Sequence, residues 1–419
     1  MKHYLVMQLA RFGDLIQSKR LVATLMRRDT AVVHLCVDNS LKSLAEIVYP
    51  EAVVHAVAAH GTGVKPAEIV RTLLLGNLPA FAELRQIEFS EVFNLNFSPL
   101  NFRLAALFDP EIVHGYKWRN GQDLVDTWPS MAMRWSRNRR IGLNLVDFWA
   151  GYCRDMIPAA QVNPEATPKG GGIGVVLAGR ESRRSLPPEV LARITATLAA
   201  RDHAPQVVLL GGQSERATGR AMMRELPPRV QAVTRNLAGQ TDWTGLVEVV
   251  GSLDMVITPD TGTMHLAAHL GTPVLAFFLS SAWCFETGPY GMGHTVYQAQ
   301  APCLPCLETV PCEYGVKCLS CFDDPGFPRF LTTGKAEHCP DGLTAFHSGF
   351  DDLGMDFTPF AGTDSERKTR QAFRKFLADY LGQKWQAGGQ EPFSGAERIF
   401  QARDWMGEAE ANGYRFTAD

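Results

Sequence analysis

Two stretches of alternating strand-like and helix-like segments, separated by a linker, set the strongest limit on how this chain can fold. The first stretch begins with an apolar run at residues 3–9, helical spacing at 15–28 and a second apolar run at 31–38. A Pro- and Gly-rich segment follows at 162–172, and the alternation then resumes and continues to residue 279. Strands that alternate with helices are typical of parallel sheets with crossover helices. We therefore predict an α/β fold with two Rossmann-like domains that face each other across a central cleft, where ligands commonly bind.

The length of 419 residues leaves room for more than these two domains. We predict an N-terminal Rossmann-like domain at residues 1–161 and a second one at 173–300. A cysteine-rich segment is expected at 301–345, followed by a C-terminal helical extension at 346–419. Within the extension, apolar residues at helical spacing predict a helix over 364–385.

Charge and hydropathy exclude several kinds of partner. A formal net charge of −3 gives no reason to expect a nucleic-acid partner. The sequence has no apolar run of the ~20 residues that span a bilayer, and its first residues, MKHYLVMQLARFGDL, lack the features of a signal peptide. We therefore expect a cytoplasmic protein, in which unpaired thiols are the norm.

The segment PDTGTMH, in the second half of the chain, has the features of an anion site. Asp260 ends an apolar strand, and Thr261, Gly262 and Thr263 form the turn into a helix. A helix N-terminus presents free N–H groups to an anion, and a glycine lets the backbone approach a phosphate closely. His265 lies one turn into the helix and can donate to the same anion. The pattern is equally compatible with a capped crossover helix that carries a packed histidine.

The segment RFGDL places a second carboxylate at the end of the first strand. In open parallel sheets, ligands bind at the carboxyl ends of the strands. Asp14 is therefore a candidate general base, although Asp is also a favoured residue at a helix cap. The chain has neither a G-x-G-x-x-G nor a G-x-x-x-x-G-K-[ST] motif, so dinucleotide-binding and P-loop functions lose their main support.

Taken in order, the segments RFGDL, VLAGRESRRSLPPE, LLGGQSER, NLAGQTDW and PDTGTMHLAAHLGTPVLAFF resemble glycosyltransferase family 9, the heptosyltransferase group with the GT-B architecture. The resemblance covers roughly residues 1–320 and is strongest at 173–291. It implies that Asp14 deprotonates the acceptor hydroxyl, and that transfer inverts the anomeric carbon. It also implies a set of donor-binding residues: Arg184, Glu215, Asp260, Thr261, Gly262, Thr263 and His265.

The resemblance also bears on metal use and on the acceptor. No D-x-D triplet occurs in the chain, so a metal that bridges the donor diphosphate is not supported, and no cofactor is expected to be required for catalysis. The helix that follows RFGDL contains QSKRL where family members often have a proline. We predict that Arg11 and Lys19, with Arg20 beside them, contact an acidic acceptor.

Six of the nine cysteines lie between residues 303 and 339. Two C-x-x-C pairs, Cys303 with Cys306 and Cys318 with Cys321, have spacing that suits a four-thiolate zinc or iron site. Reduced thiols packed in a loop, or disulfides, remain the alternatives. The cluster is too far along the chain from any acid–base pair to indicate catalysis.

These observations predict a glycosyltransferase that moves a sugar, with ADP-heptose as the favoured donor, to a lipopolysaccharide-core or related glycan or glycolipid acceptor. Such an acceptor is compatible with peripheral contact at the inner membrane surface. Two alternatives remain: a catalytically silent GT-B module that binds a nucleotide or glycan for a partner, and a cysteine-rich metalloprotein in which the Rossmann-like domains are only a scaffold.

Overall fold

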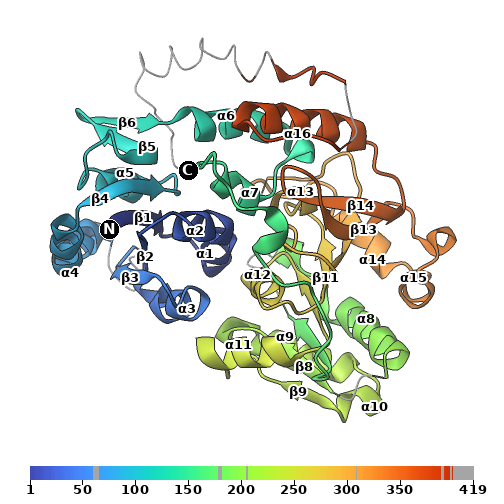
Figure 1. Cartoon of the computed structure of the whole chain (residues 1–419). Coiled ribbons are helices and arrows are strands. Elements are labelled where there is room, and N and C mark those ends of the chain that lie inside the picture. The colour runs from blue at the N-terminus through green and yellow to red at the C-terminus, as the bar shows by residue number, and fades with distance from the viewer. Residues whose placement is uncertain are drawn as a thin grey trace.

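The computed structural model has two sheets flanked by helices, and the last helix returns to the first half of the chain (Figure 1). It describes residues 1–59, 66–177, 182–203, 206–307, 309–387, 391–396 and 399. The prediction of an α/β fold with two Rossmann-like domains is confirmed. None of the described helices combines the length and the apolarity needed to cross a bilayer.

The first sheet has six strands in the order β3-β2-β1-β4-β5-β6, and all neighbours are parallel except β5 and β6. Successive residues of β1 enter two different apolar clusters, with Tyr4 and Val6 in one and Leu5 and Met7 in the other. Both faces of the sheet are thus buried, as in most parallel sheets. The strands are β1 (Lys2–Gln8), β2 (Ala31–Asp38), β3 (Val53–Val57), β4 (Phe89–Asn94), β5 (Val113–Arg119) and β6 (Gln122–Val125).

The helix predicted at 15–28 is divided into two at Ser18. The Ser18 hydroxyl donates to the carbonyl of Leu15 at 2.7 Å, and such local bonds compete with the helical ladder. The helices of this half of the chain are α1 (Phe12–Gln17), α2 (Lys19–Met26), α3 (Lys42–Val48), α4 (Pro66–Gln86), α5 (Pro99–Ala105), α6 (Thr127–Trp135) and α7 (Leu145–Ala150).

The second sheet has eight strands in the order β14-β13-β12-β11-β10-β7-β8-β9, parallel except at β12-β13-β14. Its strands are β7 (Ile173–Val176), β8 (Val207–Leu210), β9 (Thr234–Asn236), β10 (Met255–Pro259), β11 (Val274–Phe278), β12 (Thr295–Ala299), β13 (Leu343–Phe350) and β14 (Met355–Ala361). The helices are α8 (Pro188–Arg201), α9 (Arg216–Glu225), α10 (Pro228–Gln231), α11 (Trp243–Ser252), α12 (Gly262–His269), α13 (Cys284–Thr287), α14 (Ser320–Asp323), α15 (Phe327–Thr333) and α16 (Arg367–Leu381).

The C-terminal part differs from the expected helical extension at 346–419. The boundary at 345/346 falls inside β13, because β13 and β14 form a hairpin that pairs with β12 and covers what would otherwise be a free sheet edge. Helix α16 lies within the predicted 364–385, the described residues 396 and 399 are also helical, and residues 400–419 lie outside the described residues.

Helix α16 packs against the first half of the chain rather than the second sheet. It lies beside α6 in Figure 1, where Phe373 and Tyr380 contact Trp135 and Trp128 at ring-centroid distances of 5.3 and 5.9 Å. The extension therefore belongs to the second sheet through its hairpin and to the first domain through its helix.

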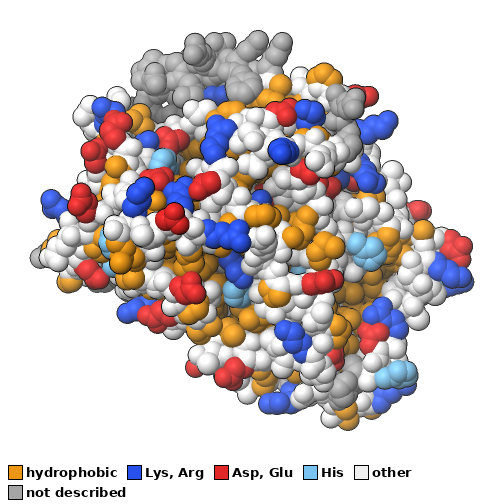
Figure 2. Space-filling model, viewed as in Figure 1, with side chains coloured by type: hydrophobic (Ala, Val, Ile, Leu, Met, Phe, Trp, Pro, Cys, Tyr) orange, Lys and Arg blue, Asp and Glu red, His pale blue; other side chains and the backbone are white. Residues whose placement is uncertain are grey.

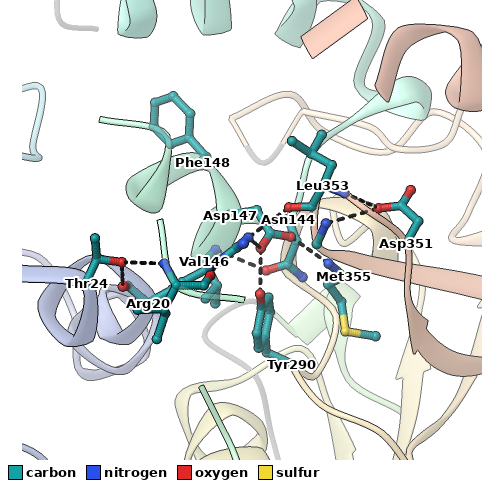
Figure 3. A network of polar contacts seen from close by, with 12 residues as sticks. Arg20, Thr24, Asn144, Val146, Asp147, Phe148, Tyr290, Asp351, Leu353 and Met355 are labelled. Carbon is teal, nitrogen blue, oxygen red and sulfur yellow. Dashed lines mark hydrogen bonds and ion pairs between the residues drawn. The ribbon is translucent and has the colours of Figure 1, made fainter. Parts of the chain in front are cut away.

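Asp147, on α7, joins three parts of the molecule (Figure 3). Its Oδ1 accepts from Arg20 Nη1 and from the Tyr290 hydroxyl, both at 2.6 Å, and its Oδ2 accepts from the Met355 N–H at 2.7 Å. Arg20 Nη1 also donates to the Leu353 carbonyl at 2.8 Å. The Arg20 and Asp147 side chains are only 5% and 1% exposed, so each needs the other to offset the loss of water.

We expect Asp147→Ala to lower the free energy of unfolding by about 3–5 kcal/mol, because it leaves the Arg20 guanidinium buried without its carboxylate. Denaturant unfolding followed by circular dichroism measures this. The matched control is Glu111→Ala, which removes the partner of Arg119 in an exposed ion pair and should cost about 0–1 kcal/mol. Equal costs for the two variants would contradict a supporting role for Asp147.

A chain of hydrogen-bonded histidines crosses one face of the first sheet. His3 Nδ1 lies 2.9 Å from His34 Nε2, His34 Nδ1 lies 2.9 Å from His55 Nε2, and His55 Nδ1 lies 3.1 Å from a Glu83 carboxylate oxygen. Each of the two contacts between rings joins the Nδ1 of one ring to the Nε2 of the next, so that one of the two nitrogens donates and the other accepts. Burial, and then the neighbouring histidines, lower the pKa of His34 to about 4.

We expect stability to fall as the pH drops from ~6.5 to ~4, because in this window the unfolded chain binds protons that the folded chain excludes. His34→Gln should reduce proton uptake on unfolding near pH 5 by up to about one proton, measured from the pH dependence of the free energy of unfolding. The exposed His203 supplies the control variant His203→Gln. An unchanged slope in His34→Gln would show that the His34 ring is not held neutral by the fold.

Candidate active site

A cleft of about 850 Å³ lies between the two domains. The carboxyl ends of β1, β7, β8 and β10 and the N-termini of α1, α11 and α12 surround it. All but two of the residues predicted for catalysis, donor and acceptor line this cleft: Arg11, Asp14, Arg184, Glu215, Asp260, Thr261, Gly262, Thr263 and His265. Two segments that are far apart in the sequence therefore form one site.

Figure 2 shows basic and acidic side chains interspersed over the visible face of the molecule. Inside a cleft the dielectric response is weaker than in water, so each charge there acts more strongly on a ligand.

The N-terminus of α12 forms one wall of the cleft. Thr261 is the N-cap, and its hydroxyl accepts from the Met264 N–H at 3.3 Å. In the part of the chain that the structure describes, the N–H groups of Gly262 and Thr263 have no protein acceptor. Together with the helix dipole, these groups form a site suited to an anion.

Asp260 and Arg184 form a buried ion pair beside this helix N-terminus. Asp260 Oδ2 accepts from Arg184 Nη2 and from the Thr287 hydroxyl, the latter at 2.9 Å. The two charged side chains are 7% and 13% exposed. Asp260 therefore orients the guanidinium and balances part of its charge.

Asp14 faces this wall from the first domain. It is the third residue of α1, and its Oδ2 accepts from the Arg11 N–H at 3.1 Å, so the carboxylate both caps the helix and lines the cleft. Burial, and then the negative charge of Asp260, raise the pKa of Asp14 to about 6. A carboxylate with a pKa near 6 is ionised at neutral pH and still basic enough to take a proton in a transition state.

His265 is buried, and its Nε2 lies 2.9 Å from the Gln17 amide nitrogen, which donates. Burial is the main cause that lowers the pKa of His265 to about 4, so the ring is neutral. Nε2 is therefore engaged across the domain interface. The sequence analysis predicted that His265 donates to an anion. If Nε2 were the donor, its hydrogen bond with Gln17 would first have to break.

Glu215 lies at the other end of the cleft, in the turn after β8. Its Oε2 accepts from the Gly212 N–H at 2.7 Å and its Oε1 from the Ser214 hydroxyl at 2.5 Å. These local bonds hold the carboxylate at the rim, in a position where it can still accept from a ligand hydroxyl, because each oxygen has a second lone pair.

The predicted acceptor contacts at Lys19 and Arg20 are not supported by their positions. Lys19 Nζ donates to Asn163 Oδ1 at 3.0 Å and to His269 Nδ1 at 2.8 Å, and does not line the cleft. Burial lowers the pKa of Lys19 to about 8. Arg20 is held in the Asp147 network. Both face inward because α2 packs its basic residues against the linker and the second domain.

The four cysteines predicted as metal ligands do not come together as a set. All nine cysteines are free thiols, and the described residues contain no group of three or more His, Cys, Asp or Glu arranged to hold a metal. Cys321 is buried, and its thiol donates to the Cys318 carbonyl at 3.5 Å. Burial raises the pKa of Cys318, and the neighbouring thiols of Cys303, Cys306 and Cys312 raise it further. Burial, and then the neighbouring thiol of Cys318, raise the pKa of Cys321 to about 12.

Sequence reasoning missed several residues of the cleft: Phe12, Gln17, Trp243 and Thr287. Trp243 begins α11, and its Nε1–H donates to the Ser40 carbonyl of the first domain at 3.1 Å. Trp243 directly follows NLAGQTD, in a segment that carries the family resemblance, and this position could have indicated that it lines the cleft. Phe12 and Gln17 carried no such signal, because apolar and amide residues on a helix most often pack in the core.

Known proteins are similar to part of this sequence. The family model of glycosyltransferase family 9 (heptosyltransferase) matches residues 187–316. Lipopolysaccharide heptosyltransferase 2 of Escherichia coli is 35% identical over 77 residues, which is 18% of this chain and 22% of that protein. The corresponding protein of Salmonella typhimurium is 36% identical over 73 residues, 17% of this chain and 21% of that protein. The sequence match thus spans about a fifth of the curated relatives' length.

Solved structures match over a larger part of the chain. The E. coli ADP-heptose lps heptosyltransferase II structure covers 71% of this chain and 90% of its own, with a TM-score of 0.53 and 19% identity. A family 9 glycosyl transferase from Veillonella parvula covers 70% of this chain and 85% of its own, with a TM-score of 0.56 and 15% identity.

The structural matches show that the chain has the two-domain GT-B fold of glycosyltransferases, with the cleft between the domains. Within that fold, residues 187–316 are similar to glycosyltransferase family 9 (heptosyltransferase), the family that the motifs of the chain resemble.

Proposed function

We propose that this protein is an inverting, metal-independent glycosyltransferase that moves a sugar from a nucleotide-diphospho-sugar to a glycan or glycolipid acceptor. The observation that carries the proposal is the position of Asp14, with its pKa raised to about 6, opposite the anion site at the N-terminus of α12. A base and a site for the leaving group thus occupy opposite walls of one cleft, as a single displacement requires.

The donor diphosphate binds at the N-terminus of α12. The N–H groups of Gly262 and Thr263 and the guanidinium of Arg184 supply the positive electrostatic potential there. Since the chain has no D-x-D triplet, these protein groups carry the role that a bridging metal has in other glycosyltransferases. Glu215, at the far end of the cleft, accepts from the nucleoside part of the donor.

The acceptor hydroxyl gives its proton to Asp14 while its oxygen attacks the anomeric carbon from the face opposite the diphosphate. The bond from that carbon to the diphosphate oxygen breaks, and the leaving group takes the electron pair. The negative charge that develops is stabilised by Arg184 and by the helix N-terminus. Arg11 is exposed beside Asp14 and contacts an acidic acceptor.

ADP-heptose is the favoured donor and a lipopolysaccharide-core or related glycan the favoured acceptor. The E. coli proteins that share the fold or part of the sequence carry these substrates in their names. A glycolipid acceptor would bring the protein to the inner membrane surface, and a cytoplasmic location fits a soluble nucleotide-sugar donor.

The catalytic role is tested with Asp14→Asn, which keeps the size of the side chain and an acceptor for the Arg11 N–H. We expect transfer to fall by about 10²–10⁴-fold, the range for loss of a general base, while the donor still raises the melting temperature. In the wild type, log(kcat/KM) should fall with unit slope below pH ~6, because protonated Asp14 cannot act as base. Unchanged turnover of Asp14→Asn would contradict the base assignment. Donor binding without transfer to any acceptor in the wild type would instead favour the silent module.

The donor site is tested by melting-temperature shifts with a panel of nucleotide-diphospho-sugars. We expect the largest shift with ADP-linked sugars. Arg184→Ala should weaken donor binding by about 10–100-fold, the equivalent of one charge-assisted bond. Its neighbour Arg183 donates to the Val310 carbonyl and does not line the cleft, so Arg183→Ala is the control and should leave the shift unchanged. A shift of equal size for all nucleotides would refute ADP as the preferred nucleotide.

A further inference from the structure

The N-termini of α1 and α12 approach each other closely at two glycines. A Cβ atom on Gly262 would lie 2.2 Å from Phe12 Cζ and 2.4 Å from Phe12 Cε1 and Cε2. A Cβ atom on Gly13 would lie 3.2 Å from Gly262 Cα and 3.2 Å from His265 Cδ2. Real Cβ atoms do not approach other atoms to 2.2 Å, so the Phe12 ring can occupy this place only because residue 262 is glycine.

The Phe12 ring also contacts an aromatic ring of the second domain. Its centroid lies 5.0 Å from that of Trp243, at an interplanar angle of 56°. Trp243 is in turn bonded back to the first domain, through Nε1–H to the Ser40 carbonyl. The bond between Gln17 and His265 continues the same interface further along α1. Phe12 therefore lies at the centre of the contact between the two walls of the cleft.

Asp14 is two residues after Phe12 on the same short helix. The contacts that hold Phe12 against α12 therefore also set the distance between the Asp14 carboxylate and the anion site. Burial and the charge of Asp260 are the two causes that raise the pKa of Asp14, and both depend on how closely α1 packs against the second domain. If the contact were lost, both causes would weaken and the pKa of Asp14 would fall toward its usual value.

We propose that Phe12 is a positioning residue whose ring, seated on Gly262, sets the spacing between the catalytic carboxylate of the first domain and the donor loop of the second. This inference rests on the proposed function of Asp14, and it adds the residue that places that base. Phe12 touches neither reacting atom in this scheme and acts through α1.

The experiment is a double-mutant cycle with Phe12→Ala, Gly262→Ala and the two combined. In Gly262→Ala the new methyl group collides with the ring and displaces α1, so we expect kcat/KM to fall by at least ~10-fold, a one-ångström-scale effect on reacting geometry. In the double variant the methyl group enters the space that the ring leaves. We therefore expect the double variant to be more active and to melt at a higher temperature than Gly262→Ala alone.

The pH profile separates positioning from mere structural support. Phe12→Ala should move the acid limb of kcat/KM to lower pH by about one unit, because Asp14 regains water and moves away from Asp260. Phe12→Leu, which keeps an apolar side chain of similar reach, should restore most of the wild-type midpoint and serves as the folded conservative variant. Additive effects in the cycle, or an acid limb that stays at the wild-type pH in Phe12→Ala, would overturn the inference.

The inference and the proposed function fail in different ways. If Asp14→Asn transfers sugar like the wild type, the base assignment fails, whatever the cycle shows. If Asp14→Asn is inactive while the melting temperatures of the cycle show no rescue of Gly262→Ala by Phe12→Ala, only the seat of Phe12 on Gly262 is refuted.

Discussion

The arrangement of this protein depends on one buried carboxylate. Asp147 holds Arg20 of the first domain, Tyr290 of the second and the backbone of Met355 in the C-terminal hairpin, all within 2.7 Å. Because its charge is removed from water, these bonds offset the cost of burying it. The network lies close to the cleft, since Leu145, two residues before Asp147, lines it.

Within the cleft, the basic group Arg184 and the carboxylate of Asp14 have different electrostatic surroundings. Arg184 is paired with Asp260, which orients the guanidinium beside the N-terminus of α12, the part of the second wall suited to an anion. Among the described residues Asp14 has no cationic partner and is instead buried near Asp260, and its pKa rises as a result. A carboxylate whose pKa is raised by burial and by a nearby negative charge, with no cation to lower it, can accept a proton and release it again. The seat of Phe12 on Gly262 maintains these surroundings.

Sequence reasoning was most accurate where a role depends on position along a strand or helix. The carboxylates at Asp14 and Asp260 were recognisable because each lies close after a strand, Asp260 directly after β10 and Asp14 in the first turn of the helix after β1, and strand ends of a parallel sheet lie at one edge. It was wrong about the direction of Lys19 and Arg20, since both faces of α2 are covered and the basic side chains pair with His269, Asn163 and Asp147. For the cysteines, the C-x-x-C spacing suggested a set with Cys321, but Cys321 is buried in α14, where its thiol donates to the Cys318 carbonyl.

The sequence by itself determined the two α/β domains, the family motifs and the residues at the mouths of the strands, because these follow from local hydrophobic periodicity and turn chemistry. Only the tertiary structure decided which of them face one another. Gln17 and His265 are 248 positions apart and Lys19 and His269 are 250, yet each pair is hydrogen bonded. Such long-range contacts also raise the pKa of Asp14, keep the His265 ring neutral and determine where Phe12 lies. No local pattern encodes them, because burial and charge at a site depend on every segment that packs around it.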